Sequence, residues 1–180
     1  MRKILTMILI TLPALAFSQD RDGNDTPGEW VIDHHRAFGL WDSMCDHRVT
    51  GDAREERCYI RYVDVFSGRP NFAAQFFFLT PGPRVEFGME AGTLFDLDGF
   101  RILQNNLVTW DAAQPSCLVG LACNYEAESA NALLAQMAKG TEFAFDFIDR
   151  HGTRQSLRWD LTPFPDALKD FESQSADRGL

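Results

Sequence analysis

Apolar and polar residues alternate with a period of two along the stretch 141–160. Phenylalanine occupies positions 143, 145 and 147 before the glycine at 152, and leucine or tryptophan alternates with polar residues after it. This period is typical of strands with one buried face, so the stretch predicts an antiparallel hairpin. A three-residue loop, 150–152, keeps the apolar faces together because it pairs Phe145 with Leu157. A two-residue turn would slip the register by one residue and expose one apolar face. Gly152 is expected to take the left-handed conformation at the third loop position.

Two segments have the composition of helices. The run Ser129–Lys139 consists mostly of strong helix formers, with Ser129 as the expected N-cap and Gly140 as the stop. It is only about three turns long, so it must pack on a sheet to be stable. The segment Pro163–Glu172 is amphipathic at helical spacing and predicts a short terminal helix, followed by a frayed tail at 173–180.

Short apolar runs between turn residues predict the remaining strands. His34–Arg36 is expected to connect the first two strands, and the densely charged Asp46–Arg57 is expected to form a loop. Seven or more short strands with regular turns predict an all-β fold, an antiparallel β-sandwich, with a closed barrel as the alternative. The expected strands lie at 30–33, 40–45, 58–66, 72–79, 85–87, 93–97 and 107–110.

The N-terminus has the pattern of a secretory signal peptide. Two basic residues precede an apolar run of about 14 residues, which is too short to span a bilayer comfortably, and small residues then offer a cleavage site. We therefore expect a leader at 1–18, a flexible lead-in at 19–29 and a single domain at 30–172. No later segment of the sequence reaches transmembrane length. The expected location is the periplasm or the outside of the cell.

The chain is acidic, and this narrows its possible partners. It has 17 Lys and Arg against 26 Asp and Glu, a formal net charge of −9, and loss of Arg2 and Lys3 with the leader would make it more negative by two. An acidic surface argues against nucleic acid and anionic membranes as partners. We expect a protein or another cell-envelope component instead.

Four cysteines in an exported chain predict two disulfides. Of the three possible connectivities, we favour Cys45–Cys58, which would close the charged segment, together with Cys117–Cys123, which would pin a tight loop. A zinc site is the alternative, but the spacings within these pairs match no standard zinc finger.

Several short motifs occur together in an order that resembles one bacterial family. They are Trp30, Gly39–Cys45, Cys58, Glu90–Gly92, Leu97–Gly99, Cys117–Cys123, Asn131–Leu134, Lys139–Gly140, Phe143–Asp149, Gly152, Leu161 and Pro163–Leu168. The ordered set resembles the invasion-associated locus B family of Gram-negative bacteria over nearly the whole mature chain. The resemblance implies a periplasmic or surface protein with an immunoglobulin-like β-sandwich, and some members are associated with entry into host cells. It carries over no catalytic residue.

Two segments are candidate contact surfaces for a partner. One is an apolar run with phenylalanine on both faces of its strand, which fits either a central strand covered on each side or a face held for a partner. The other lies in the charged segment. The candidate binding residues are Phe76, Phe77, Phe78, Arg54, Glu55 and Glu56.

The remaining candidate chemistry lies around Asp33, His34 and His35. Two adjacent histidines could bind a metal at a turn, but on a strand they would point to opposite faces. No nucleophile elbow, zinc-protease, Walker or dinucleotide motif occurs in the sequence, so no catalytic residue and no cofactor is assigned. The sequence therefore favours a non-enzymatic binding module of the cell envelope, with a periplasmic hydrolase or metal-binding protein using this histidine region as the alternative.

Overall fold

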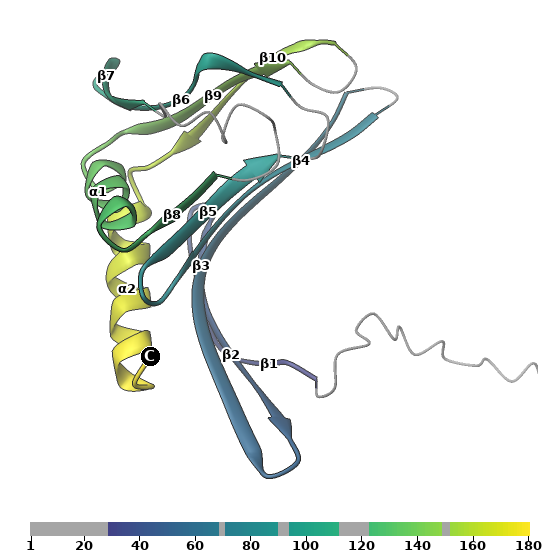
Figure 1. The fold of residues 1–180 in the computed structure, drawn as a ribbon, viewed down its shortest axis with the longest axis vertical. Helices are drawn as coiled ribbons and strands as arrows, with labels where there is room; N and C mark the ends of the chain where they lie inside the picture. Colours follow the sequence, from purple (N-terminus) through teal and green to yellow (C-terminus); the bar gives the residue numbers. More distant parts are fainter. Residues whose placement is uncertain (1–28, 69–70, 90–93, 112–122, 149–151) are drawn as a thin grey trace, which may run out of the picture.

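Two antiparallel β-sheets form most of the computed structural model, which describes residues 29–68, 71–89, 94–111, 123–148 and 152–180 (Figure 1). The larger sheet has the strand order β1-β2-β3-β4-β5-β8, and the smaller sheet has the order β10-β9-β6-β7. The strands are β1 (Val31–Phe38), β2 (Trp41–Thr50), β3 (Ala53–Gly68), β4 (Asn71–Thr80), β5 (Arg84–Met89), β6 (Leu94–Gln104), β7 (Leu107–Asp111), β8 (Cys123–Glu126), β9 (Glu142–Ile148) and β10 (Arg154–Asp160). The helices within the described residues are α1 (Ala127–Met137) and α2 (Phe164–Asp177). The predicted all-β sandwich with a helix before the last hairpin and a helix after it is confirmed.

One aromatic core fills the space between the two sheets. Phe87 of β5 meets Phe100 of β6 and Phe143 of β9, with ring centroids 4.8 and 5.1 Å apart. Trp41 of β2 lies edge-on to Trp159 of β10 and donates its indole N–H to the Asp160 carbonyl at 2.8 Å. Edge-to-face contacts of this kind suit the ring quadrupoles, and the hydrogen bond satisfies the buried indole nitrogen. Residues from both sheets and both helices therefore share one core.

The last hairpin has the predicted register. β9 and β10 pair Phe145 with Leu157 and Phe143 with Trp159. Gly152 has a φ of 80°, the left-handed conformation expected for it. Side chains alternate between the two faces of a strand, and facing residues share a face. Both apolar sets therefore lie on the core side only if the numbers of paired residues add up to an even value.

Helix α1 begins two residues before its predicted N-cap. Ser129 lies inside the first turn, where its hydroxyl accepts a hydrogen bond from the Glu126 N–H at 3.1 Å and donates one to the Glu126 carbonyl at 2.8 Å. The serine thus stabilises the helix start from within. Gly140 follows the helix as predicted, but for another reason. A Cβ there would lie 2.5 Å from the Ile102 Cγ2, so packing against β6 requires the glycine.

Helix α2 runs five residues beyond its predicted end. Phe164, Ala167, Phe171 and Ser175 recur at helical spacing and are all buried. The residues 173–177, expected to be part of a frayed tail, are helical because this face continues to pack on the larger sheet. Packing of the buried face on the sheet stabilises these last turns of the helix, although their polar sequence had suggested a frayed end.

Two segments that we expected to be irregular are parts of strands. His34–Arg36 belongs to β1, and the turn comes later, at Gly39, whose φ is 64°. Asp46–Arg57 is a ribbon in which β2 and β3 pair directly up to Thr50 and Ala53 (Figure 1). The loop prediction was wrong because oppositely charged residues face each other across the two strands, and such pairs stabilise a ribbon.

Several expectations fall on parts of the chain that the structure does not describe. The predicted leader and nearly all of the lead-in lie outside the described residues, as does Cys117.

Candidate functional site

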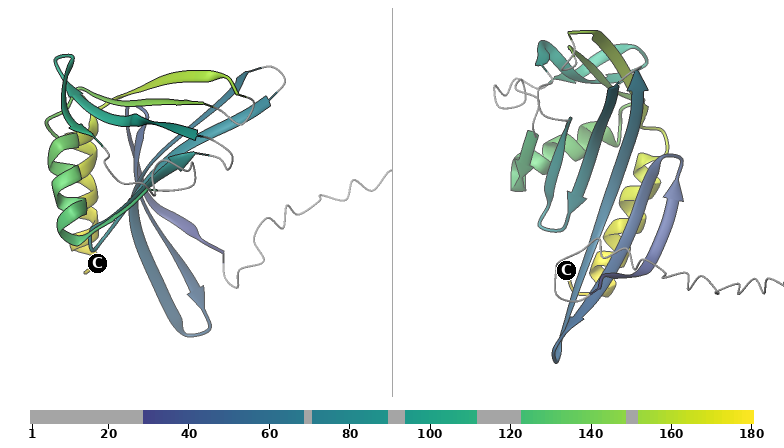
Figure 2. Two further views of the ribbon diagram at one scale, coloured as in Figure 1. Left: turned by 45° about the horizontal axis from the view of Figure 1, so that its top comes forward. Right: turned by 90° about the vertical axis from the view of Figure 1, so that its right-hand side faces the viewer.

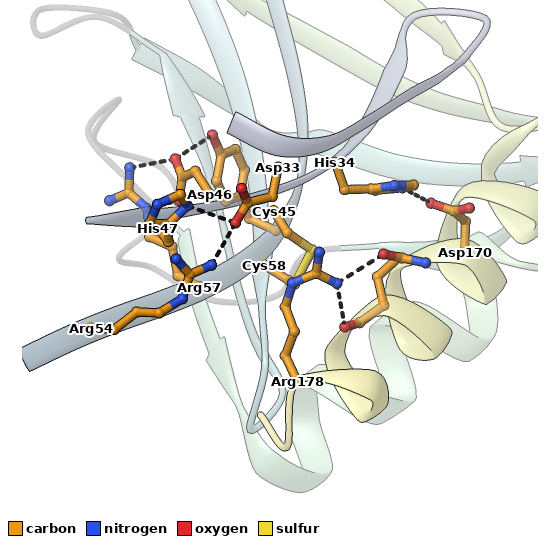
Figure 3. The surroundings of a disulfide bond; sticks show 12 residues. Asp33, His34, Cys45, Asp46, His47, Arg54, Arg57, Cys58, Asp170 and Arg178 are labelled. Atoms are coloured by element: carbon orange, nitrogen blue, oxygen red, sulfur yellow. Dashed lines mark hydrogen bonds and ion pairs between the residues drawn. A yellow bond between two sulfur atoms is a disulfide. The ribbon is translucent and has the colours of Figure 1, made fainter. Parts of the chain in front are cut away.

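The disulfide between Cys45 and Cys58 joins β2 to β3, as the sequence predicted (Figure 3). The two cysteines face each other in the strand register, with Cα atoms 4.1 Å apart, and neither is exposed. The closed loop corresponds to about 3 kcal/mol of stabilisation through restriction of the unfolded chain. Cys123 is also disulfide-bonded, and its predicted partner Cys117 lies outside the described residues.

Asp46 lies beside the disulfide as a nearly buried carboxylate. Arg57 binds it with both arms of its guanidinium, Nε to Oδ1 at 2.7 Å and Nη2 to Oδ2 at 3.0 Å. Tyr59 donates its hydroxyl to the same carboxylate at 3.3 Å. Hydrogen bonding to Asp46 raises the pKa of Arg57 in spite of partial burial. Burial first, and then the charge of Asp46, raises the pKa of Tyr59. A bidentate pair of this kind is a strong and directional contact.

Trp30 stacks on the arginines of the ribbon. The Arg57 guanidinium carbon lies 3.7 Å from the centre of the tryptophan ring, and that of Arg48 lies 4.8 Å from it. Arg48 is held in turn by Glu55, with Nη2 to Oε2 at 2.7 Å. Cation–π contact and ion pairing together fix the arginine side chains in one orientation.

The predicted phenylalanine run divides between the two faces of β4. Phe77 is fully buried and meets Trp41 with ring centroids 5.2 Å apart, so it belongs to the core. Phe76 and Phe78 point the other way, half-buried, with ring centroids 5.8 Å apart. Phe76 lies opposite Val63, which is 50% exposed.

Apart from the core residues Phe77 and Trp41, the arginine and aromatic side chains described above lie on one surface. It is the side of the larger sheet turned away from the core. Both described helices lie on the other side, where they contribute to the core. Sequence reasoning found two members of this surface and missed the rest. The signal was present, because alternate positions of β3 from Arg57 to Val63 are arginine, tyrosine, arginine and valine. We call this surface the outer face; it comprises Trp30, Arg57, Tyr59, Arg61, Val63, Phe76 and Phe78.

The other predicted binding residues lie elsewhere on β3, near the tip of the ribbon. Arg54 donates to Glu56 at 2.8 Å and to Asp33 at 3.1 Å, and Glu55 pairs with Arg48. Even Glu56, which is nearest, lies five positions along β3 from Arg61, the residue that faces Phe78. This is roughly 17 Å at the usual rise per residue. The structure therefore does not bring Arg54, Glu55 and Glu56 together with the phenylalanines.

The structure also separates the histidines of the metal hypothesis. Both belong to β1 and point to opposite faces, as strand geometry requires. The His34 Nε2 lies 2.7 Å from the Asp170 Oδ2 of α2, whereas the His35 Nε2 lies 2.9 Å from the Asp42 Oδ1 of β2 (Figure 3 shows the first pair). No group of three or more His, Cys, Asp or Glu side chains suited to a metal occurs within the described part of the chain.

Asp170 connects helix α2 to the first strand. Burial opposes its ionisation, but the hydrogen bond with His34, together with the nearby Ser43 and Arg36, outweighs this and holds the pKa of the carboxyl below its usual value. Arg36 adds a weaker contact at 3.5 Å. These contacts hold helix α2 against strand β1 of the larger sheet.

An open groove of about 390 Å³ runs between β1 and α2. Neither His34 nor His35 lines it, so it does not unite the residues of the hydrolase hypothesis. Its lining residues are Arg36, Phe38, Asp166, Lys169, Asp170 and Ser173.

Comparison with known proteins gives a limited likeness. No protein-family model and no curated protein matches the sequence. Among solved structures, the chain is similar to the crystal structure of invasion associated protein B from Bartonella henselae. The TM-score is 0.48 and the sequence identity 12%, over 80% of this chain and 98% of that chain. At this level the likeness assigns neither an activity nor a partner to the present protein.

Proposed function

We propose that the protein is an exported, disulfide-stapled binding module that engages a protein of the cell envelope through its outer face. One observation carries the proposal: the outer face presents aromatic and arginine side chains that are already held in place. Arg57 is fixed by Asp46 and stacked on Trp30, while the rings of Phe76 and Phe78 lie next to each other.

The composition of this face is that of an interface centre. Aromatic residues and arginine are enriched where proteins bind each other and supply most of the binding energy. Side chains that are ordered before binding lose less conformational entropy when a partner docks. Small substrates usually bind in concave pockets, whereas a sheet surface rich in aromatic and arginine side chains suits a broad protein partner.

The proposed location outside the cytoplasm is supported by the disulfide and by the N-terminal pattern. Structural disulfides persist in oxidising compartments and are rare in the cytosol. No helix among the described residues is long and apolar enough to cross a membrane. N-terminal sequencing of the protein recovered from the producing cells should show a start after Ala16 or Ser18. A product that retains the first 18 residues would contradict export by signal cleavage.

The partner can be captured by photo-crosslinking in intact producing cells. A photoreactive amino acid at Val63, half-exposed and opposite Phe76 on the outer face, should capture one envelope protein. The same amino acid at Glu128, exposed on α1, is the matched control and should not capture it. Arg57→Ala should weaken capture through Val63 because it removes the stacked guanidinium. Equal capture from both positions, or no capture from Val63, would refute the proposed surface.

A further inference from the structure

Strand β1 forms one edge of the larger sheet, and among the described residues only β2 pairs with it. Its second row of backbone N–H and C=O groups is therefore available to another strand. Natural proteins usually protect such an edge because it is a template for pairing. Here the edge is eight residues long and begins with two exposed apolar side chains, Val31 at 51% and Ile32 at 56%. Figure 2 shows β1 at the margin of the sheet.

The sequence of β1 is complementary to itself when read in the opposite direction. It has two apolar residues at each end, Asp33 inside the first pair, Arg36 inside the second, and two histidines in the middle. A second copy placed antiparallel would set apolar against apolar and acid against base. Opposite charges and apolar pairs directly across two strands stabilise them, whereas like charges destabilise them.

Complementary residue types alone do not allow this pairing, because facing residues must also lie on the same side of the sheet. In a regular strand this register would fail, since Asp33 and Arg36 differ by an odd number of positions. β1 is not regular: its register with β2 shifts between Ile32 and His34, which leaves Asp33 as a bulge. The bulge restores the match.

The sides of the sheet can be followed through the partners on β2. Ile32 faces Asp46 and Ala37 faces Asp42, so both lie on the outer side. Val31 and Phe38 face His47 and Trp41, so both lie on the side of helix α2. Each apolar pair of the proposed register therefore lies on a single side.

The charged pair also lies on one side. The bulged Asp33 contacts His47 at 2.7 Å, and Arg36 contacts Asp170 of α2. The Arg36 side chain is 65% exposed, lies over the Phe38 ring at 5.0 Å, and has a long contact to Asp170, at 3.5 Å. The partner's Asp33 can therefore compete for its guanidinium. His35 lies at the centre of symmetry, where it would face the partner's His35.

The groove between β1 and α2 adds a second complementary feature. Phe38 and Arg36 line it, on the side of the sheet where Val31 also lies. In the antiparallel register Val31 stands opposite the partner's Phe38. The exposed start of one strand would thus enter the groove of the other copy, and symmetry repeats the contact.

From these features we propose that the chain forms a twofold dimer by antiparallel pairing of β1 with β1 of a second copy, joining the two larger sheets into one. In this register His35 faces the partner's His35 and Ile32 faces the partner's Ala37. Arg36 faces the partner's two-residue bulge, Asp33 with His34. The residues that pair in this dimer are not among those of the outer face, so the dimer does not depend on the proposed envelope partner.

The first test measures the mass of the exported chain in solution. Sedimentation should show a dimer that dissociates on dilution. Arg36→Asp should weaken it by about tenfold or more, because two ion pairs become two repulsive contacts. Arg84→Asp is the matched control and should leave the dimer unchanged: Arg84 is also on a strand, 54% exposed, with one long ion pair at 3.6 Å. A wild-type chain that stays monomeric at its highest soluble concentration would overturn the proposal.

The second test checks the register. Facing residues of antiparallel strands have Cα atoms about 4.5–5.5 Å apart, within the range that a disulfide can bridge. His35→Cys should therefore give a covalent dimer under mild oxidation. Ala37→Cys should not, because the two copies of position 37 would be roughly 15 Å apart. Circular dichroism would verify that both variants are folded. Equal crosslinking at the two positions, or a dimer that crosslinks only through position 37, would refute the pairing.

Discussion

Arg57 both stabilises the fold and forms part of the outer face. Its guanidinium binds the nearly buried Asp46 on one edge and covers the ring of Trp30 with its face. A carboxylate removed from water requires such a partner, since an unpaired buried charge is strongly destabilising. The neighbouring Arg54 is equally exposed. The carboxylates that it binds, however, remain partly in solvent, so they depend less on their partner.

This difference predicts unequal effects of two matched substitutions. Arg57→Met should lower the free energy of unfolding by about 2 kcal/mol, a value reduced from that of a fully buried pair because the arginine is half-exposed. Arg54→Met should lower it by less than about 1 kcal/mol. Both side chains are 49% exposed, whereas their acceptors differ: the Asp46 side chain is 4% exposed and that of Glu56 is 27% exposed. Urea unfolding of the two variants measures the difference, and equal losses would show that burial of the acceptor has no effect.

At the scale of elements, close packing fixes where helix α1 must end. Gly140 follows the helix and donates its N–H to the Gln136 carbonyl at 2.9 Å. The backbone passes so close to β6 that a methyl group at position 140 would overlap Ile102 and touch Leu161. The glycine thus allows the chain to turn from helix into β9 directly against the core.

We predict that Gly140→Ala destabilises the protein by about 2 kcal/mol, in the range of overpacked core sites. Ile102→Ala removes the methyl group that would overlap. Gly140→Ala should therefore be clearly less destabilising in the Ile102→Ala background than alone, giving a measurable coupling in a double-mutant cycle. Strict additivity of the two changes, measured by thermal or urea unfolding, would exclude the overlap as the cause.

At the scale of the whole molecule, the two sheets are joined by rings that also carry polar groups. Tyr125 of β8 stacks beside Phe87 and lies edge-on to Trp110 of the smaller sheet. Its burial raises the pKa of the phenol to about 12. Burial therefore favours the neutral phenol over the phenolate in the folded protein.

The raised pKa predicts loss of stability at alkaline pH. The folded-state pKa of Tyr125 lies above the ordinary value of 10.0, so its contribution is present below pH 10 and is lost as the pH rises toward about 12. Tyr125→Phe should flatten this part of the curve of unfolding free energy against pH. The measurement is chemical unfolding at a series of pH values, with pH 8 as the reference at which the phenol is neutral in both states. A variant with the same alkaline slope as the wild type would assign the loss to other groups.

The sequence by itself determined the features that depend on local pattern. The register of β9 with β10 followed from the alternation of apolar residues around Gly152. The Cys45–Cys58 pair was favoured among three connectivities because it closes the charged segment. The existence of α1 and α2 followed from composition and periodicity. These features depend on neighbours in the chain, whose spacing the sequence fixes directly.

Only the tertiary structure decided the features that depend on distant neighbours. His34 and His35 lie in a strand because β2 lies beside them, and the charged segment is a ribbon because Arg48 finds Glu55 across it. Phe77 lies in the core, whereas Phe76 and Phe78 lie on the other face of β4. Only the assembled sheet shows which face is covered. Charge density alone cannot distinguish a solvated loop from a paired ribbon, because the stabilising contact joins residues whose meeting depends on the fold.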